Sequence, residues 1–131
     1  MSMGDAGLDI IQQIDITSPD DWHLHIRDGD IMASILPSTF KWASRAIIMP
    51  NLVPPITTHD MAIAYRERIK ALIPDTNAFE PLLTLYLTEH TQPNDVLEAF
   101  AAGVISAVKL YPAGATTNSQ NGVTDLSHAY P

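Results

Sequence analysis

The chain has 131 residues, of which 46% are hydrophobic and 17% charged, a composition typical of a globular domain with a core. Its formal net charge of −8 argues against nucleic-acid binding, which requires a basic surface. The sequence contains no cysteine, so disulfides and thiolate metal sites are excluded and any metal must be bound by His, carboxylate or a modified side chain.

Residues 1–17 are predicted to form an N-terminal tail and lead-in, and residues 18–131 the folded domain. The first 13 residues contain two acidic residues and neither Lys nor Arg, whereas a signal peptide begins with a positively charged region. No segment approaches the roughly 18 consecutive apolar residues of a membrane span. Together with the lack of cysteine, these features favour a cytoplasmic protein with no membrane partner.

Four short apolar runs predict β-strands that are buried on both faces. The runs comprise residues 22–26, 46–49, 82–87 and 104–110. Longer segments with helical patterns separate them, so the predicted order is β-α-β-α-β-α-β. This order implies parallel strands that are joined by right-handed crossovers.

Two of the separating segments have recognisable helix signals. In the first, apolar residues fall at spacings of four, four and three after Thr57, namely Met61, Tyr65, Ile69 and Leu72, which is one face of a helix. Thr57 with Asp60 is a plausible N-terminal cap, and Pro74 is expected to stop this helix. The second begins with Pro93 and ends at Gly103, the usual placement of these two residues at helix ends.

The predicted order is compatible with a doubly wound sheet and with a (β/α)₈ barrel. No glycine-rich phosphate loop follows the first run, which weakens the doubly wound, nucleotide-binding alternative. A complete barrel needs about 250 residues, so the chain has room for roughly half of one. Residues 111–125, rich in Gly, Thr, Asn and Ser, are predicted to form a long loop after the fourth strand, and such loops are often lids.

His23 and His25 are two residues apart on the first predicted strand, so both imidazoles should point to the same face. Two converging imidazoles can bind one metal ion, although two strand histidines can also simply pack or form hydrogen bonds. Arg27 is two residues further on and is expected on the same side, where it could bind a substrate carboxylate. The alternative for Arg27 is a surface ion pair with Asp28 or Asp30.

Asn51 and Lys109 are further candidates. Asn51 follows the second strand, at the end where barrel enzymes place their active sites, but Asn is also an ordinary turn residue. Lys109 lies inside an apolar run, and burial together with a nearby metal would favour its neutral amine, which can take up carbon dioxide to form a carbamate. It could equally be a lysine whose ammonium group reaches solvent at a strand end.

Two threonines of the long loop, Thr116 and Thr117, could donate hydroxyl hydrogen bonds to a bound substrate, although by default they are loop residues without a role. The remaining histidines have no partner at ligand spacing and are expected to be structural or solvated. They are His59, His90 and His128.

Four stretches taken together resemble one family. They are DWHLHIRDGD, AIIMPNLVPP, PLLTLYLT and AVKLYPAGATTNSQNGVTD. In this order they resemble the single-function bacterial and fungal dihydroorotases of the amidohydrolase superfamily, over residues 18–125. The resemblance implies an α/β fold, a partial (β/α)₈ TIM barrel that comprises roughly the first four βα units.

The resemblance also implies roles for individual residues. His23 and His25 correspond to ligands of one zinc ion, and Lys109 to a carbamylated lysine that bridges two zinc ions. Arg27 and Asn51 correspond to the groups that hold the substrate carboxylate. Thr116 and Thr117 lie in the family's lid loop.

The implied reaction is the reversible cyclisation of N-carbamoyl-L-aspartate to L-dihydroorotate in pyrimidine biosynthesis. The implied partner is a small-molecule substrate, and a homodimer is possible for the full-length family.

The family's remaining histidine ligands and its catalytic aspartate correspond to positions beyond Pro131, so no catalytic acid or base is assigned within this sequence. We therefore expect a truncated dihydroorotase with little activity alone. Two alternatives are a related cyclic-amide hydrolase of the hydantoinase type and an inactive half-barrel that serves as an interaction module.

Overall fold

The computed structural model describes residues 13–129, in which strands and helices alternate along the chain. The strands are β1 (Asp20–Leu24), β2 (Arg45–Ile48), β3 (Glu80–Tyr86) and β4 (Ile105–Lys109). The helices are α1 (Gly29–Thr39), α2 (His59–Lys70), α3 (Pro93–Ala101) and the short 3₁₀ helix η1 (Leu126–Ala129). The predicted order is therefore confirmed, while most of the predicted N-terminal tail, residues 1–12, lies outside the described residues.

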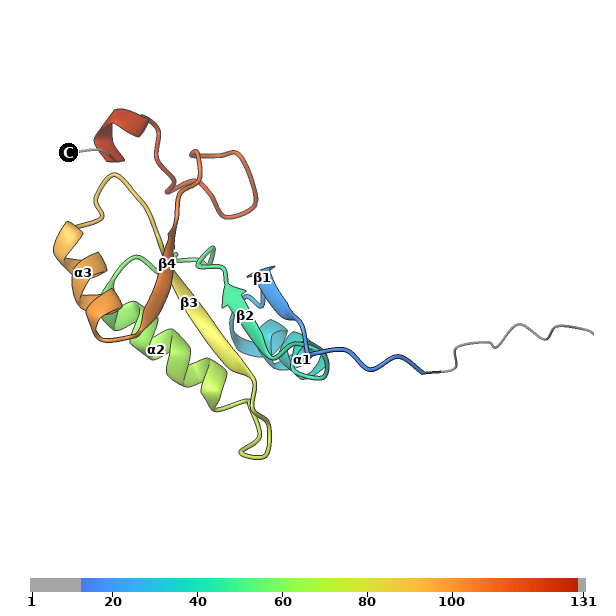
Figure 1. The fold of residues 1–131 in the computed structure, drawn as a ribbon. Helices are drawn as coiled ribbons and strands as arrows, with labels where there is room; N and C mark the ends of the chain where they lie inside the picture. The colour runs from blue at the N-terminus through green and yellow to red at the C-terminus, as the bar shows by residue number, and fades with distance from the viewer. Residues whose placement is uncertain (1–12, 130–131) are drawn as a thin grey trace, which may run out of the picture.

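The four strands form one parallel sheet in the order β1-β2-β3-β4. Each strand pairs with the next one along the chain, so right-handed crossovers place all three α-helices on the same face of the sheet. A doubly wound sheet reverses its strand order and carries helices on both faces. The observed order is that of successive units of a (β/α)₈ barrel, and the strands run side by side with α2 and α3 along one side (Figure 1).

Local sequence explains where the helices begin and end. Asp28 caps α1 by accepting a hydrogen bond from the Gly29 N–H, and Thr58 caps α2 by accepting one from the Met61 N–H. The predicted cap at Thr57 was therefore wrong by one residue, because Thr58 is the last residue with extended backbone before the helix. Helix α2 also ends at Lys70, before Pro74 can act.

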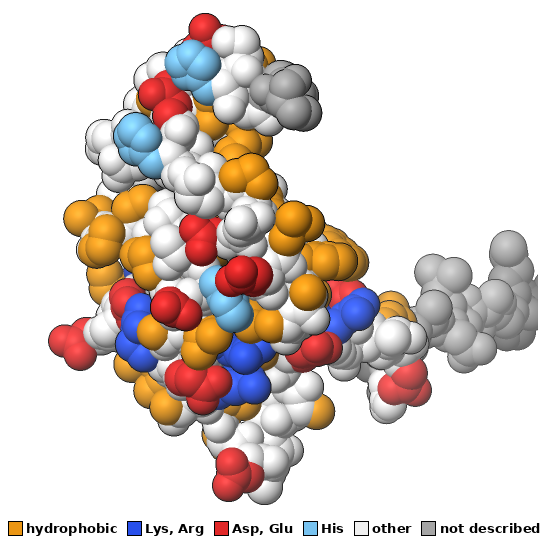
Figure 2. Space-filling view, turned by 90° about the vertical axis from the view of Figure 1, so that its left-hand side faces the viewer, with side chains coloured by type: hydrophobic (Ala, Val, Ile, Leu, Met, Phe, Trp, Pro, Cys, Tyr) orange, Lys and Arg blue, Asp and Glu red, His pale blue; other side chains and the backbone are white. Residues whose placement is uncertain are grey.

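The hydrophobic core lies between the sheet and the helices. Tyr65 and Ile69 from α2 and Leu83 and Leu85 from β3 are all at most 1% exposed, so the predicted face of α2 points inward at these two positions. The prediction was wrong for Leu72, which lies beyond the end of α2 and is 37% exposed. The outer side of the helices carries interspersed acidic and basic side chains, with apolar side chains towards its edges (Figure 2). Such a mixed surface is normal for helices that face water.

The two outer strands are less buried than expected. Strand β1 contains no fully buried residue and β4 contains one, whereas the last four residues of β3 are all buried. The prediction of strands buried on both faces was therefore wrong for β1 and β4, because each lies at an edge of this sheet and lacks a neighbour on one side. Among residues 13–129, no helix is long and apolar enough to cross a membrane.

Candidate metal and anion site at the carboxyl ends of the strands

The rings of His23 and His25 converge at the carboxyl end of β1. Their Nε2 atoms are 3.2 Å apart and their ring centroids 5.2 Å apart. His23 lies in β1 and His25 directly follows its last residue, so the extended backbone places both rings on the same side. The geometry agrees with the expected common face, while the metal-binding role of the pair stays a prediction.

Positive charge surrounds His25. Burial, followed by the charges of Lys109, Arg27 and His23, lowers the pKa of His25 from 6.5 to about 4. The imidazole is therefore neutral near pH 7, which is the form that binds metals. Burial and the Arg27 charge also lower the pKa of Lys109, in the direction that favours its neutral amine. The Lys109 Nζ lies 5.3 Å from the centre of the Tyr111 ring.

The histidine pair fits a zinc ion. Two nitrogen ligands at 2.0–2.1 Å from a tetrahedral zinc are about 3.3 Å apart, close to the observed 3.2 Å. Within residues 13–129, no group of three or more His, Asp or Glu side chains could hold a metal. The described chain therefore offers two imidazole ligands, with Lys109 as the only further candidate that the sequence named.

Arg27 reaches its position through an unusual backbone conformation. It has φ of +60°, in the left-handed region that residues other than glycine rarely adopt. Strand alternation therefore does not set its direction, so the premise of an extended backbone was wrong, although Arg27 does lie close enough to His25 for its charge to lower the pKa of His25. Its Nη1 donates a hydrogen bond of 3.0 Å to the backbone oxygen of Asn51. Asp28, offered above as an ion-pair partner, pairs instead with Arg68.

Asn51 is fully buried at the end of β2, beneath the loop that follows β4. Its Nδ2 donates to the backbone oxygen of Asn118, and Asn118 Nδ2 donates to the backbone oxygen of Asn51, both at 3.4 Å. The Asn51 Oδ1 has no hydrogen-bond partner in the part of the chain that is described. Asn51 is thus more than a turn residue, because it links the strand ends to the loop.

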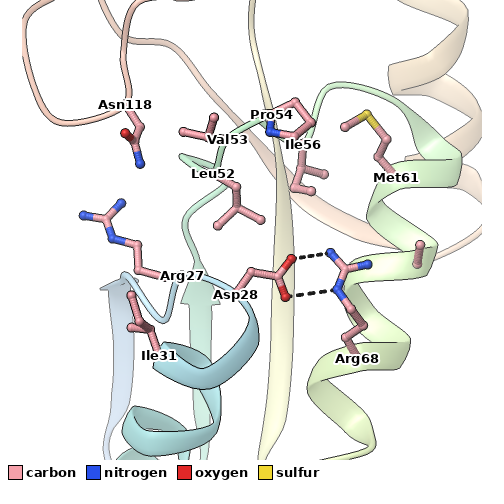
Figure 3. A pocket seen from close by; sticks show the side chains of 11 residues that line it. Arg27, Asp28, Ile31, Leu52, Val53, Pro54, Ile56, Met61, Arg68 and Asn118 are labelled. Carbon is pink, nitrogen blue, oxygen red and sulfur yellow. Dashed lines mark hydrogen bonds and ion pairs between the residues drawn. The ribbon is translucent and has the colours of Figure 1, made fainter.

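Asn118 is a site residue that was not predicted from the sequence. Its φ is +54°, a conformation that Asn tolerates better than most residues. The residue type Asn is therefore the only, weak, sequence signal for this position. Its side chain lies above the Arg27 guanidinium, at the rim of a cavity of about 450 Å³ (Figure 3). Arg27, Asp28 and Arg68 line the same cavity, whereas His23, His25 and Lys109 do not.

The predicted loop after β4 is a compact one whose ends meet. Pro112 and Val123 form an isolated parallel bridge at its base, and Gly122 packs there where a Cβ would collide with the backbone of Tyr111. Thr116 and Thr117 are exposed at the tip. The structure therefore brings Asn118 to Arg27 and Asn51, and not the two threonines.

A second contact holds the far end of this loop. The Glu89 carboxylate accepts hydrogen bonds from the backbone N–H and the hydroxyl of Thr124, and it lies 3.6 Å from His128.

Of the other histidines outside the site, His90 is exposed. The ring nitrogen Nε2 of His59 is buried without a partner among the described residues.

The chain is similar to dihydroorotases. It is 62% identical over 120 residues to the dihydroorotase of Jannaschia sp. and 59% identical over 120 residues to that of Ruegeria sp.. Each alignment covers 92% of this chain and 35% of the relative, so the chain spans about a third of the length of these curated relatives. No protein-family model matches the chain.

Solved structures give the same result. The crystal structure of Saccharomyces cerevisiae dihydroorotase in complex with 5-fluoroorotic acid matches with a TM-score of 0.81 and 40% identity, over 90% of this chain and 32% of that one. The dihydroorotase of Campylobacter jejuni matches with a TM-score of 0.77 and 37% identity, over 87% of this chain and 33% of that one. The expected partial barrel is thereby confirmed.

Proposed function

Because the chain belongs to the dihydroorotase family, we propose that it carries metal-binding and substrate-carboxylate-binding residues for the reversible cyclisation of N-carbamoyl-L-aspartate to L-dihydroorotate. The observation that carries this proposal is the convergence of the His23 and His25 Nε2 atoms, 3.2 Å apart, beside the cations of Arg27 and Lys109. A metal ligand pair and a fixed guanidinium are what a substrate with an amide and a carboxylate requires.

His23 and His25 would hold zinc, with Lys109, once carbamylated, as a further ligand of the two-zinc centre that the family resemblance implies. When bound, zinc supplies Lewis acidity that polarises a carbonyl group. Burial is the largest cause of the lowered pKa values of His25 and Lys109. It supports these assignments, because metal binding and carbamate formation both use the neutral side chain. Other divalent ions also accept imidazole ligands, so the identity of the metal as zinc is itself proposed.

Arg27 would receive the substrate carboxylate. Only one of its N–H groups is committed to a described acceptor, the Asn51 backbone oxygen, and a guanidinium has five donors in a planar fork. The bond to Asn51 therefore aligns the fork while leaving donors for a bidentate contact with a carboxylate. A bare hydantoin ring has no carboxylate to accept this contact, which favours dihydroorotate over a hydantoinase-type substrate.

Asn51 would assist Arg27 only when the loop has moved. Its side chain is fully buried and one of its amide N–H groups is bonded to Asn118. A substrate can therefore reach this amide only if residues 112–123 lift away, which supports the role of this segment as a lid. Thr116 and Thr117, exposed at its tip in the observed position, would donate to the substrate only after the loop has moved and closed over it.

The test measures ligand affinity, because the chain spans only about a third of its relatives. Calorimetric titration of the zinc-loaded 131-residue chain with L-dihydroorotate should show binding that Arg27→Met weakens by about ten-fold or more. Arg45→Met is the matched control, since Arg45 lies at the amino end of β2 and pairs with Asp20. Equal affinities for dihydroorotate and hydantoin, both insensitive to Arg27→Met, would contradict the proposal.

The family resemblance further supports a cytoplasmic location and a homodimer for the whole protein. The lack of cysteine is compatible with this location. Sedimentation of the chain would distinguish the interaction-module alternative, for which a discrete complex that forms without zinc or substrate is expected.

A further inference from the structure

The turn that carries Arg27 contains two left-handed residues. Arg27 has φ of +60° and Gly29 has φ of +56°, and between them Asp28 caps α1. Glycine adopts this conformation freely, but arginine has a Cβ that crowds the following carbonyl oxygen. Something outside the turn must therefore hold Arg27 in this conformation.

Helix α2 provides that restraint through two side chains one helical turn apart. The Tyr65 hydroxyl donates a hydrogen bond of 2.6 Å to the backbone oxygen of Arg27. The Arg68 guanidinium donates to both carboxylate oxygens of Asp28, at 3.1 and 2.7 Å, and lies 5.3 Å from the centre of the Tyr65 ring. Both bonds reach residues of the β1–α1 turn, and Figure 3 shows the paired contact between Asp28 and Arg68.

The two bonds differ in how well they are protected from water. Tyr65 is 1% exposed, so its hydroxyl has no solvent to replace the Arg27 carbonyl as a partner. Asp28 and Arg68 have side chains that are 40% and 44% exposed, and an ion pair in water is weaker. The tyrosine hydroxyl is therefore the stronger of the two restraints.

Packing does little to hold the other side of the turn. Arg27 and Asp28 border the cavity of about 450 Å³, whose opposite walls include Leu52, Val53 and Asn118 (Figure 3). Atoms that line a cavity have no close neighbours on that side to resist their movement. The cavity therefore gives the turn room to shift if its hydrogen bonds to α2 are lost, against the remaining bond from Arg27 to the Asn51 oxygen.

We propose that Tyr65, assisted by Arg68, is a positioning residue for Arg27: its buried hydroxyl holds the Arg27 carbonyl and so keeps the left-handed backbone that directs the guanidinium onto the Asn51 oxygen. This inference rests on the proposed role of Arg27 in binding the substrate carboxylate. Tyr65 itself is not expected to contact the substrate, because it is buried, its hydroxyl is bonded to the Arg27 carbonyl, and it does not line the cavity.

The experiment is a double-mutant cycle on the zinc-loaded chain, with the dissociation constant for L-dihydroorotate as the readout. Tyr65→Phe keeps the ring in the core and removes only the hydroxyl, and it should weaken binding about ten-fold, as expected for a misplaced binding group. Zinc affinity should change less than two-fold, because the hydroxyl does not touch His23 or His25. In the Arg27→Met background, Tyr65→Phe should have no further effect on dihydroorotate binding.

The outcomes separate this inference from the proposed function. If Arg27→Met leaves the dissociation constant unchanged, the proposed role of Arg27 fails. If Arg27→Met weakens binding but Tyr65→Phe does not, or if the two effects simply add, Tyr65 does not act through Arg27 and the positioning role is overturned.

A merely structural role is also distinguishable. A tyrosine that only stabilises the fold would lower the unfolding midpoint when changed to Phe and leave affinity unchanged well below that midpoint.

Should Tyr65→Phe fail to fold, the same cycle is run with Arg68→Met at its exposed position. If Arg68 assists Tyr65, Arg68→Met should weaken dihydroorotate binding about three-fold, and this effect should disappear in the Arg27→Met background. An unchanged dissociation constant would overturn the proposal.

Discussion

The His23–His25 pair and the Arg27 guanidinium come from five consecutive residues, yet the protein holds them in different ways. Among the described residues, the ring nitrogens of the histidines make a hydrogen bond only to each other. Arg27 is fixed through its carbonyl by Tyr65 and through its guanidinium by Asn51. The proposed anion-binding residue is therefore held by other side chains of the protein, whereas the ring nitrogens of the proposed metal ligands have no other described protein partner.

This difference predicts that removing a histidine acts on the metal and on little else. We expect His25→Ala to weaken zinc binding by about 100-fold or more, since even residues that only support a ligand contribute 10- to 100-fold. The free energy of unfolding of the metal-free chain should change little, because the ring has no other described hydrogen-bond partner. Zinc titration by calorimetry and urea unfolding without metal measure the two effects.

His90→Ala is the matched control for this comparison. His90 is exposed in the β3–α3 loop, and only its backbone atoms form hydrogen bonds in the described chain. Zinc affinity should therefore be unchanged by this substitution. Equal losses for His25→Ala and His90→Ala would show that the converging pair is not the zinc site.

The histidine pair and Arg27 also differ in how well their side-chain directions could be predicted from the sequence. Alternation along an extended strand placed His23 and His25 on one side, and that rule needs no knowledge of the rest of the fold. The rule does not reach Arg27 two residues later, because Arg27 leaves the extended region and its carbonyl is bonded to Tyr65, 38 residues away. Asn118 was missed for the same reason, since it meets Asn51 across 67 residues.

The fold was predicted well because its signals are local and repeated. Apolar runs separated by an amphipathic segment and by a helix bounded by Pro93 and Gly103 are enough to predict parallel strands with helical crossovers. The edges of the elements were less accurate: Thr58 and not Thr57 caps α2, and β1 ends at Leu24. A cap depends on which hydroxyl faces the first turn, and two adjacent threonines cannot be distinguished by composition.

The loop that covers Asn51 offers a smaller test of the part of the site that other side chains hold. Asn118→Gly keeps the left-handed backbone and the carbonyl that accepts from Asn51, and removes only the side-chain amide. We expect amide hydrogen exchange in residues 112–123 to become about five-fold faster, corresponding to one hydrogen bond of about 1 kcal/mol. Zinc affinity should be unaffected.

Asn121→Gly in the same loop is the control for the added flexibility of glycine, since Asn121 is exposed and lines a different cavity beside Glu89 and Thr124. Faster exchange in both variants would mean that the Asn118 side chain does not hold the loop.

The smallest expected effect is that of the exposed Asp28–Arg68 ion pair on the stability of the fold, which should depend on pH. Burial raises the pKa of Asp28, but the hydrogen bonds from Arg68 and the Gly29 N–H and the charge of Arg68 outweigh it, so the pKa lies below the ordinary value of 3.8. A carboxyl whose pKa is depressed by folding stabilises the fold above its unfolded pKa, and this contribution is lost as the pH falls through the lower folded value.

We therefore expect Asp28→Asn to lower the free energy of unfolding by at most about 1 kcal/mol at pH 7, because the pair is partly exposed and Asn still caps the helix. The difference from the unmodified chain should shrink once the pH falls below the ordinary value of 3.8, and it should vanish below the lower folded pKa, where Asp28 itself is protonated. Asp20→Asn removes the other aspartate–arginine pair, at the amino end of the strands, and serves as the control. Urea unfolding between pH 7 and pH 2 measures both, and only Asp28→Asn should also weaken dihydroorotate binding, because only Asp28 adjoins the turn that carries Arg27.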